Sequence, residues 1–360
     1  MAEKKRKNWI FLGALVFIAY TFLASLPIPE EAVIRPRWIA PLESGKSVPM
    51  GTPDSLSDDG YMPFRMGTQF GYFNGQGNFA INLETDAHLS FDADNWAEYG
   101  AMPDRVEIHS IRNEALVVLQ NPNGYPVFLD GRIFVVGNEQ NDLSSWDSNG
   151  TMQWRYDFSA PITSLDAAAG FALAGCLDGT MELIDQAGRR VYAFEPGGSR
   201  IPIILGARIS MDGKKIALIS GIDPQRFLIL ERFDESYKVV YHEFLDDGFR
   251  RPVYVSFIDK GKAVAFERSD AVGIYELGAR SSKIIQVDGR IIGMEEDGSS
   301  KQLFVLSAEG ERKHLVGIKL PDRVSTKASF RSEKTFIARI GTSLYLGGDG
   351  VLAAFDLGRK

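Results

Sequence analysis

The chain has 360 residues, 44% hydrophobic and 24% charged, a composition typical of a globular protein with a sizeable core. Its formal net charge is −7, and because residues 1–8 carry +3, the rest of the chain carries −10. An acidic body excludes nucleic acid and anionic lipid as main partners, since both attract basic surfaces.

The N-terminus predicts a single-pass membrane anchor. Within residues 1–8, four basic side chains at 4–7 precede an uncharged apolar run over 9–26. Eighteen helical residues span roughly 27 Å, close to the thickness of a bilayer core. The positive-inside rule keeps residues 1–8 in the cytoplasm, so the body is expected on the periplasmic or extracellular side of the cytoplasmic membrane. A cleaved signal peptide is the alternative.

Residues 27–63 are expected to form an extended linker, because they hold seven of the 16 prolines. We interpret the acidic stretch 54–62 as solvated linker, with calcium binding as the alternative. Only the segment 33–42, VIRPRWIAPL, is apolar enough to pack against the rest of the protein.

Residues 64–360 consist of short runs of β-forming residues bounded by Gly, Asp or Asn, which is an all-β pattern. A signature recurs among them: a large apolar residue, an Asp, and an aromatic residue seven positions after the Asp. Four copies are complete, and weaker ones lie near Glu276, Lys319 and Asp356. The turn and aromatic residues of the repeat are Asp92, Asp147, Gly150, Trp154, Asp185, Gly188, Tyr192, Asp234, Tyr241 and Asp356.

Each copy is expected to be the hairpin that joins the last two strands of a four-stranded unit. The Asp side chain can bond backbone N–H groups that follow it, and Gly supplies a positive φ. The copies lie 37 to 55 residues apart, which is the size of one propeller blade. The sequence therefore predicts a β-propeller of seven four-stranded blades over 64–360, with six or eight blades as alternatives. The repeat residues are assigned a structural role.

The end of the chain predicts how the ring closes. Only four residues follow Asp356, too few for another strand of ordinary length, about five to six residues. An N-terminal segment should therefore pair beside 350–357. The segment 33–42 is favoured over 61–70, because its apolar side chains would otherwise be stranded in the linker.

These repeats resemble known propeller families. WDSNGTMQW (146–154) and IDQAGRRVY (184–192) resemble the repeat of pyrroloquinoline-quinone-type propellers, and SMDGKKIALIS (210–220) resembles that of WD40 and TolB-type propellers. The likeness covers about residues 65–360. The quinone-dependent enzymes of the first family use adjacent cysteines, whereas this chain has only Cys176. Closer in character are non-enzymatic envelope members, one of which assists outer-membrane protein assembly.

The resemblance and the residues leave two function classes open. The favoured one is a non-enzymatic, membrane-anchored protein-interaction scaffold outside the cytoplasm, with Arg250 and Arg251 as candidate contacts for an acidic partner. The alternative is a ligand-binding or enzymatic propeller, quinone- or glycan-related, with its site at the channel mouth. We expect no cofactor, no metal and no catalytic residues. Exposed Tyr, Phe and Arg at the channel mouth would favour the scaffold, and buried ionisable groups lining the channel would favour the enzyme.

Overall fold

The computed structural model describes residues 17, 20, 35–42, 60–298 and 300–357. The chain divides into two compact units, Met1–Ala32 and Val33–Lys360. No helix within the described residues has both the length and the apolar character needed to cross a membrane. The transmembrane helix expected over 9–26 is thus not supported, and only Phe17 and Tyr20 of that stretch are described. Residues 1–8 and most of the linker 27–63 also lie outside the described residues.

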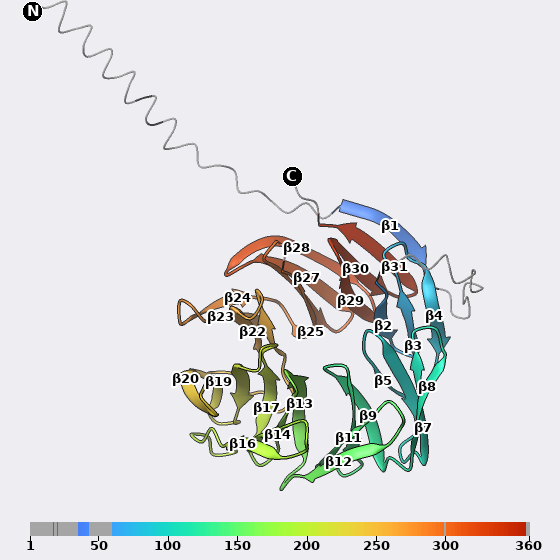
Figure 1. The fold of residues 1–360 in the computed structure, drawn as a ribbon. Helices are drawn as coiled ribbons and strands as arrows, with labels where there is room; N and C mark the ends of the chain where they lie inside the picture. The colour runs from blue at the N-terminus through green and yellow to red at the C-terminus, as the bar shows by residue number, and fades with distance from the viewer. Residues whose placement is uncertain (1–16, 18–19, 21–34, 43–59, 299, 358–360) are drawn as a thin grey trace, which may run out of the picture. The chain divides into compact units, whose positions relative to one another are not determined.

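The second unit is built from eight antiparallel sheets, here called blades 1 to 8, which follow one another around a ring (Figure 1). Seven have four strands and one has three, counted over the described residues. Their strands are β2–β4 (Met62–Met66, Gln69–Phe73, Phe79–Glu84) in blade 1; β5–β8 (His88–Phe91, Asn95–Tyr99, Arg105–Ser110, Ala115–Gln120) in blade 2; β9–β12 (Gly124–Leu129, Arg132–Gly137, Asp142–Trp146, Met152–Asp157) in blade 3; β13–β16 (Ile162–Ala168, Phe171–Cys176, Met181–Ile184, Arg190–Phe194) in blade 4; β17–β20 (Ile204–Ile209, Lys215–Ser220, Gln225–Phe233, Ser236–Leu245) in blade 5; β21–β24 (Val255–Ile258, Ala263–Arg268, Ala271–Glu276, Ser281–Gln286) in blade 6; β25–β28 (Arg290–Asp297, Gln302–Glu309, Arg312–Lys319, Arg323–Arg331) in blade 7; and β29–β31 (Thr335–Ile340, Ser343–Gly348, Val351–Asp356) with β1 (Arg35–Pro41) in blade 8.

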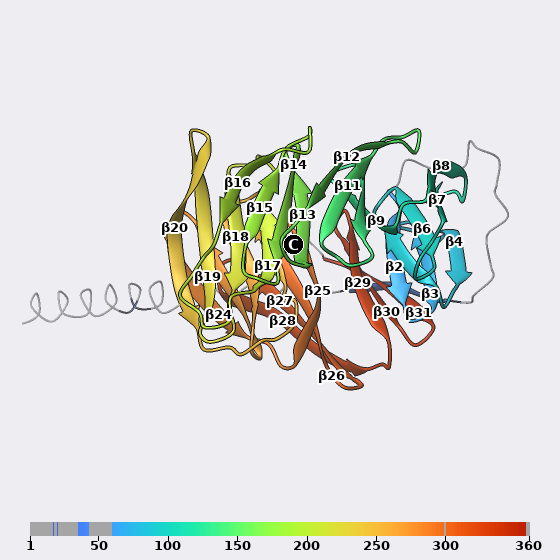
Figure 2. The ribbon, with the colours of Figure 1, turned by 90° about the horizontal axis from the view of Figure 1, so that it is seen from below.

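The ring has two sides that differ in their connections (Figure 2). In a four-stranded blade the first and third hairpins lie on one side, which we call the turn face. The second hairpin, and the connection from the outer strand to the inner strand of the next blade, lie on the other side, which we call the loop face. The alternation follows from the antiparallel order of the strands.

The fold is an all-β propeller of eight blades, so the prediction of seven was wrong. The repeat predicts an outer hairpin at Asp92, but this residue lies between β5 and β6, the first two strands of blade 2. Two blades therefore occupy residues 62–120, where one had been expected. Their outer hairpins, 74–78 and 110–114, do not match the repeat, because they begin with Asn74 and Ser110 instead of Asp.

The three residue types make the same turn. The side-chain oxygen accepts hydrogen bonds from the backbone N–H groups two and four positions later: at 2.9 Å for Asp147, 3.0 Å for Asn74, and 3.2 and 3.3 Å for Ser110. The residue three positions later has a positive φ, 83° at Gly77 and 63° at Asn113. A short side-chain acceptor followed by a left-handed residue is what this turn requires, and Asp is one of several solutions.

Blade 1 has three strands, and the one it lacks among the described residues is the innermost. Its β2–β3 hairpin lies on the loop face, since a Cβ on Gly67 would come within 2.5 Å of Lys334, just before β29. Near the end of β3, the Tyr72 hydroxyl donates to the carbonyls of Asp92 and Asn95 on the turn face, at 2.9 and 2.8 Å. β3 therefore runs from the loop face to the turn face, as the third strand of a four-stranded blade does. β2 accordingly takes the place of a second strand and forms the inner edge of this blade.

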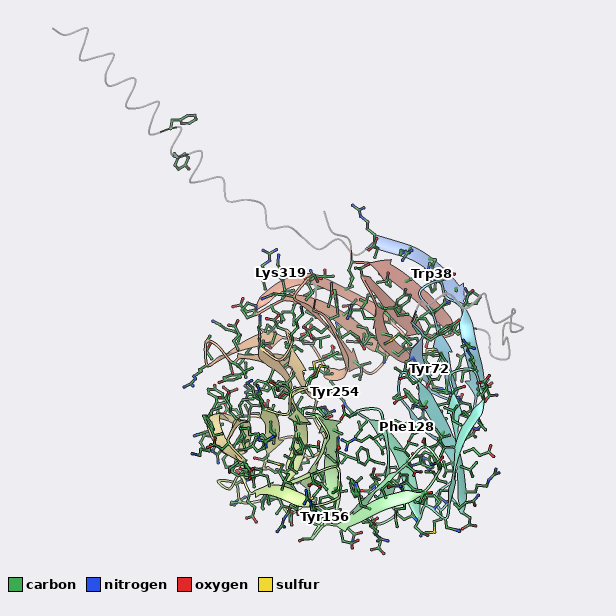
Figure 3. The ribbon with its side chains drawn as sticks, viewed as in Figure 1. Trp38, Tyr72, Phe128, Tyr156, Tyr254 and Lys319 are labelled. Atoms are coloured by element: carbon green, nitrogen blue, oxygen red, sulfur yellow. The ribbon has the colours of Figure 1, made fainter. Side chains whose placement is uncertain are left out.

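Both ends of the second unit meet in blade 8. β1, from the segment 33–42 that we favoured, pairs antiparallel with β31, from Arg35 opposite Asp356 to Pro41 opposite Val351. Trp38 of β1 lies on the outer rim (Figure 3) and packs against Tyr345, with ring centroids 6.0 Å apart. It also covers Gly77 of the next blade, where a Cβ would lie 2.7 Å from the indole.

The aromatic residue of the repeat joins neighbouring blades. Trp154 of β12 donates its indole N–H to the Gln186 carbonyl at 3.0 Å and lies on Gly188, where a Cβ would come within 2.6 Å of the ring. Tyr192 of β16 likewise donates to the Tyr237 carbonyl in blade 5 at 2.8 Å. The seven-residue spacing thus places the aromatic side chain of one blade on the outer hairpin or outer strand of the next blade.

Candidate interaction face

The remaining repeat residues lie on or near the turn face, in structural contacts. The backbone N–H and guanidinium of Arg189 hold the pKa of Asp185 below its usual range. Asp234 has a φ of 56° in the tight β19–β20 turn. The ring of Tyr241 lies 4.2 Å from that of Tyr275 in blade 6. Asp356 ends β31 in the closing pair described above.

Arg250 and Arg251 lie in the connection 246–254 on the loop face, and the structure separates their roles. The Arg251 guanidinium bonds both carboxylate oxygens of Glu267, at 2.6 and 3.1 Å. Glu267 is only 1% exposed, so Arg251 neutralises a buried charge. This hydrogen-bonded pair raises the pKa of Arg251. Arg250 is exposed, and no partner for it occurs among the described residues.

Exposed apolar side chains lie on the same face of the ring as these arginines. Leu177, Ile201, Phe244 and Tyr254 are 50%, 48%, 57% and 39% exposed. They come from blades 4, 5 and 6 and from the connections between them, all on or near the loop face. Together with Arg226, Arg250 and Arg251 they form what we call the loop-face patch.

Contacts between neighbouring blades link the parts of the patch. A Cβ on Gly179, beside Leu177, would lie 2.5 Å from Pro202, which follows Ile201. The Arg226 guanidinium lies 5.1 Å from the centre of the Phe244 ring and donates to the carbonyls of Pro196 and Gly197 at 3.2 and 3.1 Å. These hydrogen bonds hold the connection 195–203 against the loop-face end of β19 in blade 5.

The far end of the patch reaches the inner side of the ring. Tyr254 precedes the inner strand β21 (Figure 3), and its hydroxyl donates to the Ile292 carbonyl of the next inner strand at 2.8 Å. Its backbone N–H donates to Glu267 at 3.2 Å, so the pair with Arg251 also orders Tyr254. Burial, with the charge of Glu267, raises the pKa of Tyr254, and the side chain remains a neutral donor. An exposed tyrosine thus lies at the loop-face end of the inner strands β21 and β25, and Glu267 links it to Arg251.

Ionisable groups also lie along the inner strands. Asp166 of β13 accepts from the Ile209 backbone N–H at 2.8 Å, and burial raises the pKa of its carboxyl against the opposing effect of Arg208. Burial raises the pKa of Glu295 in β25 to about 7, opposed by Arg339. In the described part of the chain, no three His, Cys, Asp or Glu residues are arranged to hold a metal ion.

Sequence reasoning found the two arginines but missed their surroundings. Glu267 lies in a run of strand residues, KAVAFER (262–268), and a charged residue there could have signalled a buried ion pair. Phe244 lies near the end of the long strand β20, where half of the residues are exposed, so nothing in its local pattern marks it as part of a patch. The patch exists only because three blades meet.

The chain is similar to known proteins in sequence and in fold. The model of a protein family described as "beta-propeller protein" matches residues 1–359. A protein of Treponema pallidum (strain Nichols), named "Uncharacterized protein", is 29% identical over 319 residues, which is 86% of this chain and 83% of the relative.

Two solved structures share the fold at low sequence identity. BamB from Moraxella catarrhalis is 13% identical with a TM-score of 0.62, over 90% of this chain and all of that one. The computationally designed Ika8 protein is also 13% identical, with a TM-score of 0.60, over 83% of this chain and 96% of the other. At this identity the likeness concerns the fold alone.

Proposed function

The chain belongs to this family of β-propeller proteins, and from that premise we propose that it is a non-enzymatic scaffold that binds a protein partner through the loop-face patch. The observation that carries the proposal is the composition of the patch. Exposed Phe, Tyr, Leu and Ile side chains lie among arginines on a rigid set of blades. Aromatic residues and Arg are enriched where protein interfaces gain most of their affinity.

The partner is expected to offer an acidic side chain beside an apolar surface. Arg250 is the cation available to it, since Arg251 is engaged by Glu267. Phe244 projects beside the Arg226 guanidinium and provides an apolar anchor. The rest of the body is acidic, so an acidic partner would be steered toward this face and repelled elsewhere.

We also propose that the protein works at the cytoplasmic membrane, with the propeller on the periplasmic or extracellular side. Support comes from the sequence alone, from four basic residues before an apolar run over 9–26. The resemblance of the repeats to envelope propellers extends this to a role in envelope protein assembly. Protease added outside intact spheroplasts should degrade the propeller, and protection of the propeller would contradict this location.

The scaffold is tested with variants of the patch. Phe244→Ser and Arg250→Glu should each reduce capture of a membrane protein that the wild-type chain retains, with unchanged melting temperature. The partner is then identified, purified, and its affinity measured with the same variants. Val324→Ser is the matched control, because Val324 is 39% exposed near the start of β28, the outer strand of blade 7, which contributes nothing to the patch. If Phe244→Ser and Arg250→Glu bind the partner as tightly as the wild-type chain does, the proposal that the partner binds through the loop-face patch is wrong.

The alternative, a ligand-binding or enzymatic propeller, is favoured by Asp166 and Glu295 on the inner strands. Each of these carboxyls has an arginine nearby that opposes its raised pKa. Such pairing also fits a structural role in holding adjacent blades together. A small molecule whose binding is lost in both Asp166→Asn and Glu295→Gln, while Phe244→Ser binds it normally, would favour the alternative.

A further inference from the structure

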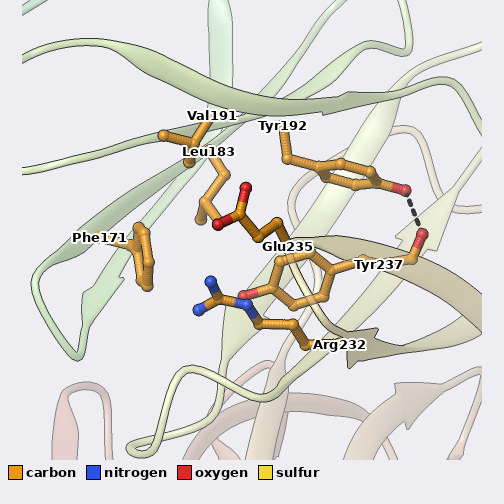
Figure 4. Close-up of a pocket in the computed structure, with 7 residues that line it drawn as sticks. All are labelled: Phe171, Leu183, Val191, Tyr192, Arg232, Glu235 and Tyr237. Carbon is orange, nitrogen blue, oxygen red and sulfur yellow. Dashed lines mark hydrogen bonds between the residues drawn. The ribbon is translucent and has the colours of Figure 1, made fainter.

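A cavity lies near the turn face, between blades 4 and 5, outside the loop-face patch (Figure 4). Its volume is about 270 Å³. It forms because the β19–β20 hairpin is long, with strands of nine and ten residues, whereas the neighbouring outer strand β16 has five. The hairpin therefore extends beyond blade 4 and leaves space beneath it.

Part of the cavity lining is apolar or aromatic and is held in place. Leu183 and Tyr237 are almost fully buried, and Val191 is 44% exposed beside them. The Tyr237 hydroxyl donates to the Gly213 carbonyl at 2.5 Å. Tyr192 in turn donates to the Tyr237 carbonyl, the bond drawn in Figure 4. Both rings are fixed before any ligand enters, which lowers the entropic cost of binding.

Two opposite charges reach the cavity from the same hairpin. Arg232 uses its Nε to donate to the Asp234 carbonyl at 2.9 Å, and its guanidinium lies 5.6 Å from the centre of the Phe171 ring. Its two terminal nitrogens have no partner among the described residues. The Glu235 carboxylate likewise has none within the described ranges, and Figure 4 shows it beside Leu183 and Val191. Neither charge is satisfied by the other.

We propose that this cavity binds a small zwitterion with an apolar body, the chemistry of a free α-amino acid with a branched or aromatic side chain. The planar guanidinium of Arg232 suits a carboxylate, and Glu235 suits an ammonium group. Leu183, Val191 and Phe171 would contact the apolar side chain. At about 30 Å³ for each water-sized group, the cavity has room for roughly nine heavy atoms, which matches leucine.

The experiment is a titration of the full chain at pH 7 with L-leucine and L-phenylalanine, followed by calorimetry and ligand-observed NMR. Leucinamide lacks the carboxylate, and N-acetylleucine lacks the ammonium group. We expect saturable binding of the free amino acids and about tenfold weaker binding of each analogue, the size of one charged hydrogen-bonded contact. If N-acetylleucine binds as well as leucine, the ligand is instead a carboxylate such as a peptide C-terminus, and the zwitterion proposal is wrong.

Variants locate the site. Arg232→Gln should weaken leucine binding about tenfold without weakening leucinamide binding further. Glu235→Gln should likewise weaken leucine binding about tenfold without weakening N-acetylleucine binding further. Val191→Trp should fill the cavity and abolish binding of every ligand. Arg312→Gln, on the exposed end of β27, is the control and should bind normally. Absence of saturable binding to the wild-type chain, or binding unchanged in Arg232→Gln, Glu235→Gln and Val191→Trp, would overturn the proposal. None of these outcomes depends on the loop-face patch.

Discussion

Replacement of Trp38 by alanine should weaken the closure of the ring more than any other single change in β1. Trp38 is half-buried between Tyr345 of its own blade and Gly77 of the next. β1 comes from the opposite end of the second unit. Pairing with β31, a hydrogen bond from Arg37 to Ser343 and the contacts of Trp38 hold it in place. Loss of the indole therefore loosens the contact between blades 8 and 1.

The expected cost follows from the area that becomes exposed. A buried aromatic side chain covers about 150–250 Å², so a half-buried Trp contributes roughly 100 Å². At about 25 cal/mol per Å² this corresponds to about 2–3 kcal/mol. Unfolding entropy is about 2.1 cal/mol/K per residue, so for a unit of this size the melting temperature should fall by about 3–4 °C.

The measurement is thermal unfolding followed by calorimetry or far-UV circular dichroism. Ile39→Ala is the matched control, because Ile39 is the adjacent residue of the same strand and is 69% exposed. It should change the stability by less than about 0.5 kcal/mol. Equal melting temperatures for Trp38→Ala and the wild-type chain, or equal losses for the two variants, would refute the reasoning that Trp38 fastens the ring.

Three further predictions concern stability. Asp185→Ala removes the acceptor of two backbone N–H groups in an outer hairpin, and urea unfolding should show a loss of about 1 kcal/mol with partner binding unchanged. Arg251→Ala leaves the buried Glu267 carboxylate without its partner and should cost about 3 kcal/mol, whereas Arg250→Ala should be neutral in the same assay. Because the folded pKa of Glu295, about 7, lies above its unfolded value, its contribution to stability is fully present below about pH 4.3 and is lost as the pH rises through 7. Because one pKa unit corresponds to about 1.4 kcal/mol, Glu295→Gln should stabilise the protein at pH 8 by about 3 kcal/mol relative to the wild type, with no difference at pH 4; equal stability at pH 8 would contradict the raised pKa.

The sequence by itself determined the fold class and the way the ring closes. Alternation of β-forming runs with turn residues is local, so the all-β interpretation could be made from neighbouring residues. Closure by the segment 33–42 could be predicted because its apolar side chains, Trp38 among them, lie in a Pro-rich stretch and need a surface to pack against. Both inferences depend on what a strand needs for pairing and burial, which does not change with its surroundings.

The blade count and both candidate sites were decided by the tertiary structure. Asn74 and Ser110 make the same turn as Asp147, so a search for one residue type could not count the blades. Arg250 and Arg251 are adjacent in sequence, yet only Arg251 meets the buried Glu267, which lies sixteen residues further along the chain. Exposure depends on which distant residues cover a side chain. A surface assembled from three blades therefore has no signature in any one of them.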